Sequence, residues 1–156
     1  MEIGLSAANV EGIRLGANIH DLGKIGVPAE ILSRPSRLNA LEYELVKTHT
    51  RVGYDIVKNI VFPWPIGDMI LHHHERLDGS GYPDGLHGDE IGIEARIIAV
   101  ADVVEAMASH RPYRPSMGID AALTEIARGR ATLFDPSVVD TCLTLFRDGR
   151  VNFGTA

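Results

Sequence analysis

The chain contains a series of amphipathic segments in which apolar side chains recur every three or four residues. This spacing puts apolar residues on one face of an α-helix, whereas the alternating pattern of a half-buried strand is scarce here. We therefore predict an all-α fold, a compact bundle of roughly five to seven helices. The predicted helices span residues 8–21, 39–60, 66–77, 94–110, 120–130 and 137–146.

The segment 39–60 has a regular apolar face. Asn39 followed by Glu42 has the form of a capping box, which predicts the first turn of a helix. His49 falls within the apolar stripe that follows, which consists of Leu41, Leu45, Val52, Ile56 and Ile60. We expect this face to lie against the core, and His49 with it.

Two later helices also carry polar residues at inward positions. His73 belongs to the stripe of the third helix, together with Ile66, Ile70 and Leu77, and His74 lies beside it. The segment 94–110 is apolar nearly all round, which predicts a buried central helix with Asp102 in its middle. These helices would bring imidazole and carboxylate groups into the interior.

Glycine, proline and capping residues separate the helices. The stretches 23–38 and 78–92 are rich in Gly and Pro and are predicted as loops. The second is long, and loops of that length usually carry function. Asp135 followed by Pro136 predicts the start of the last helix.

Composition limits the class of protein further. With 156 residues, 45% of them hydrophobic, the chain suits one domain, which we place at 1–149 with 150–156 as a flexible tail. Its formal charge of −6 disfavours nucleic acid as a partner. Cys142 has no cysteine partner and suits a reducing compartment, so we expect a cytoplasmic protein. The sequence contains neither a signal-peptide pattern nor a long apolar run, so we expect no membrane-spanning segment.

Six polar residues on four predicted helices form a candidate metal centre. They are His20, Asp21, His49, His73, His74 and Asp102. Any one inward histidine is more often a hydrogen-bonded core residue than a ligand, and one buried aspartate can serve as a cap. Burying all six without partners would cost several kcal/mol each, and a shared cation removes that cost. Nitrogen and oxygen donors without thiolate suit catalytic iron, manganese, zinc or a similar ion, and six donors suggest two divalent ions.

The motifs around these residues resemble the HD-GYP branch of the HD phosphohydrolase superfamily. They read HDLGKIGVP, HTRVG, HHHERLDGSGYP, ARIIAVADVVEAM and RPYR in that order, and the similarity runs from about Ile13 to Val139. The resemblance implies an HD-type helical bundle and a metal-dependent phosphodiesterase that hydrolyses cyclic di-GMP to pGpG and/or GMP. It also implies that the six residues named above are the metal ligands, whereas His72 has no ligand counterpart.

Two catalytic roles follow from the chemistry of phosphodiester hydrolysis. A pair of cations can activate water and neutralise phosphate oxygens, with Asp21 as the carboxylate shared between them. Lys24 would contact a non-bridging phosphate oxygen, although a solvated lysine is the commoner case. Arg111 and Arg114 would clamp the second phosphate of a cyclic dinucleotide, or Arg111 would interact with the end of the preceding helix.

The DGSGYP loop carries further candidate residues. Its glycines allow close approach to a ligand, and Tyr82 offers a hydroxyl or a stacking face for substrate. A plain turn explains the glycines equally well. The resemblance implies instead a docking surface for diguanylate cyclase (GGDEF) domains, and we also consider a homodimer. Glu75 and Asp78 are expected to orient the ligand histidines, or Asp78 to bind the loop backbone.

One departure from the family pattern opens an alternative. Family members usually carry another ligand histidine on a helix roughly thirty residues upstream of the His-Asp pair, and no histidine precedes His20 here. The chain is then a fragment or a shortened domain. The alternative function is a catalytically inactive or truncated HD-GYP module that binds cyclic di-GMP or a cyclase partner. Hydrolysis of a nucleotide monophosphate is a third reading, which the GYP segment disfavours.

Overall fold

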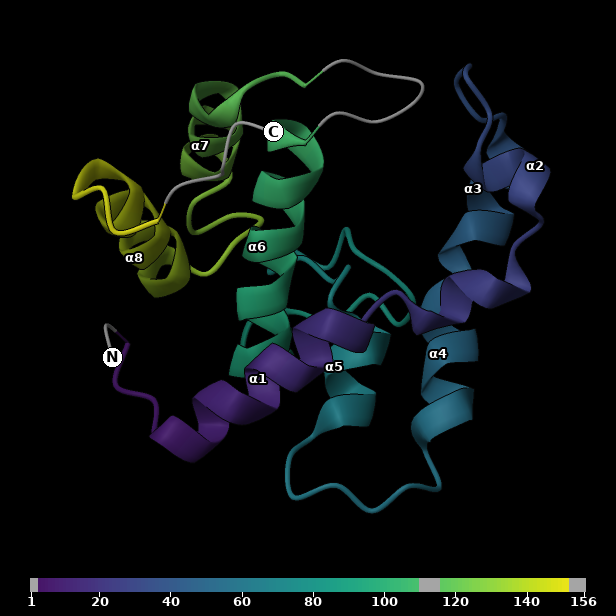
Figure 1. Ribbon diagram of the computed structural model, residues 1–156, viewed down its shortest axis with the longest axis horizontal. Coiled ribbons are helices and arrows are strands. Elements are labelled where there is room, and N and C mark those ends of the chain that lie inside the picture. The colour runs from purple at the N-terminus through teal and green to yellow at the C-terminus, as the bar shows by residue number, and fades with distance from the viewer. Residues whose placement is uncertain (1–2, 110–115, 152–156) are drawn as a thin grey trace.

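The computed structural model describes residues 3–109 and 116–151, and Figure 1 shows them as packed helices joined by loops. Two isolated bridges are the only β-pairing in these ranges, so the all-α prediction is confirmed. None of the described helices is long and apolar enough to cross a membrane. The helices of seven or more residues are α1 (Ala7–Ile19), α3 (Ala40–Lys47), α4 (His49–Val57), α5 (Ile66–His72), α6 (Ile93–Ala108), α7 (Ile119–Arg128) and α8 (Pro136–Arg147). The single turn α2 (Ala29–Leu32) and the 3₁₀ turns η1 (Leu22–Gly26) and η2 (Gly88–Glu90) complete the list.

Helix α6 is the central element, as predicted. In Figure 1 it stands between α7 and α8 on one side and α1 and α5 on the other. Val100 and Val104 pack into a core with α7 and α8. Ile98 belongs to a second core with residues of α1, α4 and α5. Because its apolar residues cover nearly the whole circumference, α6 can serve both cores at once.

The predicted helix over 39–60 is divided in two, which corrects the prediction. Thr48 is both the last cap of α3 and the first cap of α4, and its hydroxyl donates to the carbonyl of Leu45 at 2.7 Å. The capping box of Asn39 and Glu42 is confirmed. The prediction that one apolar face lies against the core is wrong, because much of the stripe is exposed to solvent. The exposed fractions are 83% for Leu41, 38% for Leu45, 46% for Ile56 and 54% for Ile60. His49 is nevertheless buried, together with Thr50, Gly53 and Val57.

The third helix buries the face that was predicted, but it ends earlier than predicted. Ile66, Ile70 and His73 are fully buried, as the stripe predicts. Helix α5, however, ends at His72 rather than at residue 77. The chain turns there, and the backbone N–H of Glu75 donates to the carbonyl of His72 at 2.9 Å. The two histidines after His72 therefore lie on a turn instead of a helix.

The predicted start of the last helix is confirmed. The carboxylate of Asp135 accepts hydrogen bonds from the backbone N–H of Ser137 at 2.8 Å and of Val138 at 3.2 Å. Its other oxygen lies 3.0 Å from the guanidinium of Arg96 in α6. One aspartate thus caps α8 and ties it to the central helix.

We expect Gly23→Ala to lower the free energy of unfolding by about 3 kcal/mol. Turn η1 packs so closely on α4 that a Cβ at Gly23 would lie 1.8 Å from the carbonyl oxygen of His49 and 2.5 Å from the backbone N of Gly53. Neither backbone atom can move aside without shifting α4. Urea unfolding measures the effect. Gly92→Ala is the control, because the nearest atom would be 3.5 Å away, and we expect it to cost less than about 1 kcal/mol. Equal losses in the two variants would contradict this account of the η1–α4 contact.

Candidate metal centre

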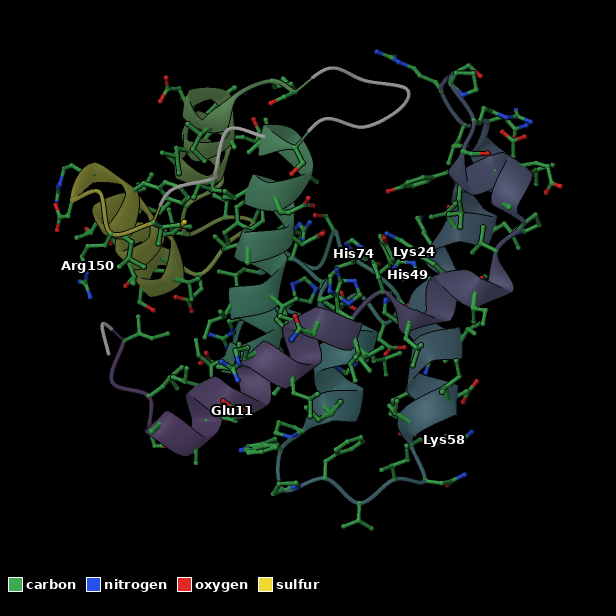
Figure 2. The ribbon with its side chains drawn as sticks, in the orientation of Figure 1. Glu11, Lys24, His49, Lys58, His74 and Arg150 are labelled. Carbon is green, nitrogen blue, oxygen red and sulfur yellow. The ribbon has the colours of Figure 1, made fainter. Side chains whose placement is uncertain are left out.

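The six predicted ligand residues come together from four parts of the fold. His20 caps the end of α1 and Asp21 precedes η1, His49 begins α4, His73 and His74 follow α5, and Asp102 lies within α6. Figure 2 shows His49 and His74 close together between α1, α4 and α6, with Lys24 beside them. The labelled side chains of Glu11, Lys58 and Arg150 lie away from this cluster.

Backbone hydrogen bonds orient three of the histidines in the same way. In each, Nδ1 lies within hydrogen-bonding distance of the carbonyl three residues earlier: His20 with Ala17 at 2.6 Å, His49 with Val46 at 2.7 Å and His73 with Ile70 at 2.8 Å. A carbonyl only accepts, so in each contact Nδ1–H is the donor, which leaves Nε2 with a free lone pair. The Nε2 atoms of His49 and His73 lie 3.4 Å apart. This arrangement gives imidazoles that are fixed for ligation.

The two aspartates face ring nitrogens of the histidines, and Nε2 of His20 lies near both. Oδ2 of Asp21 lies 3.5 Å from Nε2 of His20, and Oδ1 lies 3.5 Å from Nε2 of His49. Oδ1 of Asp102 lies 3.7 Å from Nε2 of His20. Lys24 donates to Oδ2 of Asp21 at 2.5 Å. Asp21 is therefore placed between two histidines, with one oxygen toward each.

Two atoms of this cluster are buried without a hydrogen-bond partner, Nε2 of His20 and Oδ1 of Asp21. Leaving such groups unsatisfied is costly, and a cation would use both lone pairs. Ligand atoms of His49, His73 and His74 all lie within 4.8 Å of one another, as do those of His20, Asp21 and His73. The residues present fit a metal ion bound by nitrogen and oxygen.

Burial keeps most of the cluster's imidazoles neutral, which is the form that binds metal. Burial, together with the charge of neighbouring imidazoles, lowers the pKa of His73 to about 4 and that of His74 to about 2. Burial also lowers the pKa of His49. Although burial alone would lower the pKa of His20, the nearby carboxylates of Asp102 and Asp21 and the backbone carbonyl of Ala17 raise it overall. Near neutral pH the buried rings of His73 and His74 therefore keep their lone pairs.

Glu75 has a different role from the one predicted. Its carboxylate is 2% exposed and accepts three backbone hydrogen bonds from the loop, from Asp84 at 2.7 Å, Gly85 at 3.1 Å and Leu86 at 3.1 Å. His20, His49 and His73 use backbone carbonyls instead. Asp78 accepts from the backbone and the hydroxyl of Ser80, at 3.0 and 2.6 Å, which matches the loop-backbone alternative. Both carboxylates therefore shape the loop at residues 78–92, which carries the DGSGYP motif and is called the GYP loop below.

His72 links the loop to α4. Its Nε2 lies 3.2 Å from Oδ2 of Asp84, and Oδ1 of the same carboxylate accepts from Arg51 at 2.7 Å. His72 therefore lies outside the ligand cluster, as predicted. Arg51 and Asp84 were not predicted from the sequence, because they are 33 residues apart and no local spacing connects them.

Tyr82 packs directly on the cluster. Its ring stacks on His74 with centroids 4.8 Å apart and an interplanar angle of 26°. The ammonium of Lys47 lies 5.4 Å from the centroid of Tyr82 and 4.9 Å from that of Tyr43. Tyr43 and Lys47 were not predicted as site residues, although their i, i+4 spacing just before His49 indicates one helical face. Arg111 and Arg114 lie outside the described residues.

A family model described as an HD domain matches residues 2–138 of this chain. The chain belongs to the HD domain family. The resemblance predicted from the motifs is thereby confirmed, and the metal dependence of HD domains agrees with the ligand set described above.

Several relatives of this HD domain have been named. The cyclic di-GMP phosphodiesterase response regulator RpfG of Xanthomonas campestris is 45% identical over 91% of this chain and 38% of the relative. A cyclic di-GMP phosphodiesterase of Thermotoga maritima is 42% identical over 94% of this chain and 40% of the relative. A 3'3'-cGAMP-specific phosphodiesterase of Vibrio cholerae is 38% identical over 86% of this chain and 29% of the relative. The chain therefore spans less than half the length of these relatives.

Solved structures show the same fold. A cyclic GMP-AMP-specific phosphodiesterase of V. cholerae superposes with a TM-score of 0.69 over 96% of this chain and 42% of that one, at 21% identity. An HD-GYP-type protein of Bdellovibrio bacteriovorus, Bd1817, gives a TM-score of 0.73 over 92% of this chain and 45% of that one, at 17% identity. At these identities the likeness concerns the fold, and it confirms the HD-type helical bundle.

Proposed function

We propose that this HD domain is a metal-dependent phosphodiesterase that hydrolyses cyclic di-GMP to pGpG and/or GMP. The observation that carries the proposal is the convergence of six residues with nitrogen and oxygen donors, with Nε2 of His20 and Oδ1 of Asp21 buried and unpartnered. A pure binding module has no need of such a centre. The names of the relatives, which include cyclic di-GMP phosphodiesterases, support the choice of substrate.

The ligand set supports two divalent ions, with iron or manganese as the first candidates and zinc or nickel as others. Asp21 directs one oxygen toward His20 and the other toward His49, which suits a carboxylate shared by two ions. Bound divalent ions would supply Lewis acidity toward the phosphate oxygens and lower the pKa of water at the site.

The chain's own residues would bind and orient the substrate phosphate. Lys24 is one-third exposed and lies against Asp21, so its ammonium can contact a phosphate oxygen that enters next to that carboxylate. Backbone carbonyls hold His20, His49 and His73, so these rings need not reorganise as substrate binds. We further propose that Arg111 and Arg114 bind the second phosphate.

The proposal extends to the setting of the domain. The GYP loop has a fixed backbone, because Glu75 binds it, while side chains such as Ser80 and His87 are exposed. This combination supports docking of a diguanylate cyclase (GGDEF) domain on the loop, where Tyr82 would be a contact. A homodimer is the other assembly we propose.

We place the domain, residues 1–149 followed by a short tail, in the cytoplasm, which suits the lone Cys142.

Turnover of cyclic di-GMP tests the proposal directly. The chain is loaded with iron or manganese under reducing conditions, and the products are separated by chromatography to distinguish pGpG from GMP. We expect hydrolysis that a chelator abolishes and that His20→Ala lacks. A fully metal-loaded chain that binds cyclic di-GMP without cleaving it would overturn the proposal and establish the inactive binding module instead.

A further inference from the structure

A row of side chains runs outward from the metal centre along the edge of α3. Tyr82 stacks on His74 at 4.8 Å, and the ammonium of Lys47 lies over the outer part of the row, 5.4 Å from the ring of Tyr82 and 4.9 Å from that of Tyr43. Tyr43 is 49% exposed. The row therefore connects a candidate ligand histidine to the protein surface through two aromatic rings and one cation.

The cation in this row is available for a ligand. Nζ of Lys47 donates to Glu44 at 2.7 Å, but the Glu44 side chain is 65% exposed. An exposed pair of this kind contributes little to stability, so the ammonium can exchange its partner at low cost. The two rings hold the ammonium near one place by cation–π attraction. Lys24, by contrast, is engaged with Asp21 inside the cluster.

We propose that Lys47 selects a guanine base of a cyclic dinucleotide whose phosphodiester lies at the metal centre, with Tyr43 and Tyr82 as the positioning rings. This inference rests on the proposed function, which places the substrate phosphate beside Asp21 and Lys24. The rest of a cyclic dinucleotide must then extend away from the cluster. The row of Tyr82, Lys47 and Tyr43 offers a base both aromatic contact and a hydrogen-bond donor.

The hydrogen-bonding groups of guanine and adenine decide which of the two bases Lys47 would favour. Guanine presents two neighbouring acceptors, O6 and N7, to which lysine and arginine donate readily. Adenine presents N7 beside an amino group, which is itself a donor. A lysine ammonium has donors only, so it would face the adenine amino group donor to donor. Lys47 therefore favours guanine at this position.

Binding of slowly hydrolysed phosphorothioate analogues of cyclic di-GMP and cyclic di-AMP tests the inference, with the metal-loaded chain in a calorimeter. We expect the wild type to bind the guanine analogue at least about tenfold more tightly than the adenine analogue. Lys47→Gln should weaken guanine binding about tenfold and adenine binding less than about twofold, whereas Lys47→Arg should keep the preference. Lys58→Gln is the matched control, since Lys58 has the same kind of exposed i, i+3 partner, Asp55 at 2.8 Å, away from the cluster.

The outcomes separate this inference from the proposed function. Equal weakening of both analogues in Lys47→Gln would show a phosphate contact and overturn base selection, as would a wild type without preference. Cyclic di-GMP turnover is measured in parallel on the wild type. Guanine preference that depends on Lys47 without turnover would leave the inference standing and defeat the proposed function, whereas turnover without such preference would do the reverse.

Discussion

Asp21→Asn is expected to lose the bound metal and at least about 100-fold of cyclic di-GMP turnover while keeping its fold. The asparagine side chain has one acceptor oxygen and no charge, so it cannot offer one anionic oxygen toward His20 and another toward His49. The aspartate makes no buried hydrogen bond through Oδ1, and its side chain is 36% exposed, so the fold depends little on it. Elemental mass spectrometry and a turnover assay measure the two losses, and circular dichroism checks the fold.

Asp55→Asn is the matched control for this variant. Asp55, like Asp21, pairs with a lysine three residues later, at 2.8 Å for Lys58 and 2.5 Å for Lys24. Asp55 lies outside the ligand cluster, so we expect its metal content and turnover to match the wild type. An Asp21→Asn protein that keeps both its metal and its activity would contradict the assignment of Asp21 as a shared ligand.

Glu75→Ala is expected to release the GYP loop and to lower the free energy of unfolding by about 3 kcal/mol. The variant leaves the backbone N–H groups of Asp84, Gly85 and Leu86 without the carboxylate that accepts from them. Because Tyr82 lies on this loop and stacks on His74, turnover should also fall, by about tenfold or more. Amide hydrogen exchange should show fast exchange at residues 84–86, and urea unfolding gives the stability.

Asp78→Ala tests whether the effect belongs to the buried carboxylate. Asp78 lies in the same loop but is exposed, and its carboxylate accepts hydrogen bonds from Ser80, so loss of this side chain should cost less than about 1 kcal/mol. Protection of the amides at 84–86 that survives Glu75→Ala would mean that other contacts hold the loop, and it would contradict the role given to the Glu75 carboxylate.

The sequence predicts the helices best where one apolar face meets one core. Helix α6 is apolar nearly all round and lies between two cores, as its composition indicates. The prediction of one apolar face over 39–60 is wrong because Thr48 ends one helix and starts the next. Residues before and after Thr48 therefore do not share a face. The early end of α5 at His72 depends on the loop that Glu75 binds, a contact between residues about ten apart in sequence that helical periodicity does not contain.

The sequence predicts which residues come together at the candidate site better than it predicts the contacts that orient them. His20, Asp21, His49, His73, His74 and Asp102 converge as the sequence indicates, and their role as metal ligands remains a prediction. What the sequence does not contain is orientation. The hydrogen bonds of the histidines to carbonyls three residues earlier, and the position of Lys47 between two tyrosine rings, follow from the turns at the helix ends and from tertiary packing.

The metal content of the purified chain decides whether these residues form a metal centre. Elemental mass spectrometry, after loading with iron or manganese under reducing conditions and removal of free metal, gives the number of ions per chain. We expect close to two ions in the wild type and a clear loss in Asp21→Asn. A folded wild-type chain that retains no more metal than Asp21→Asn would contradict a metal centre built from these six residues, and the proposed hydrolysis with it.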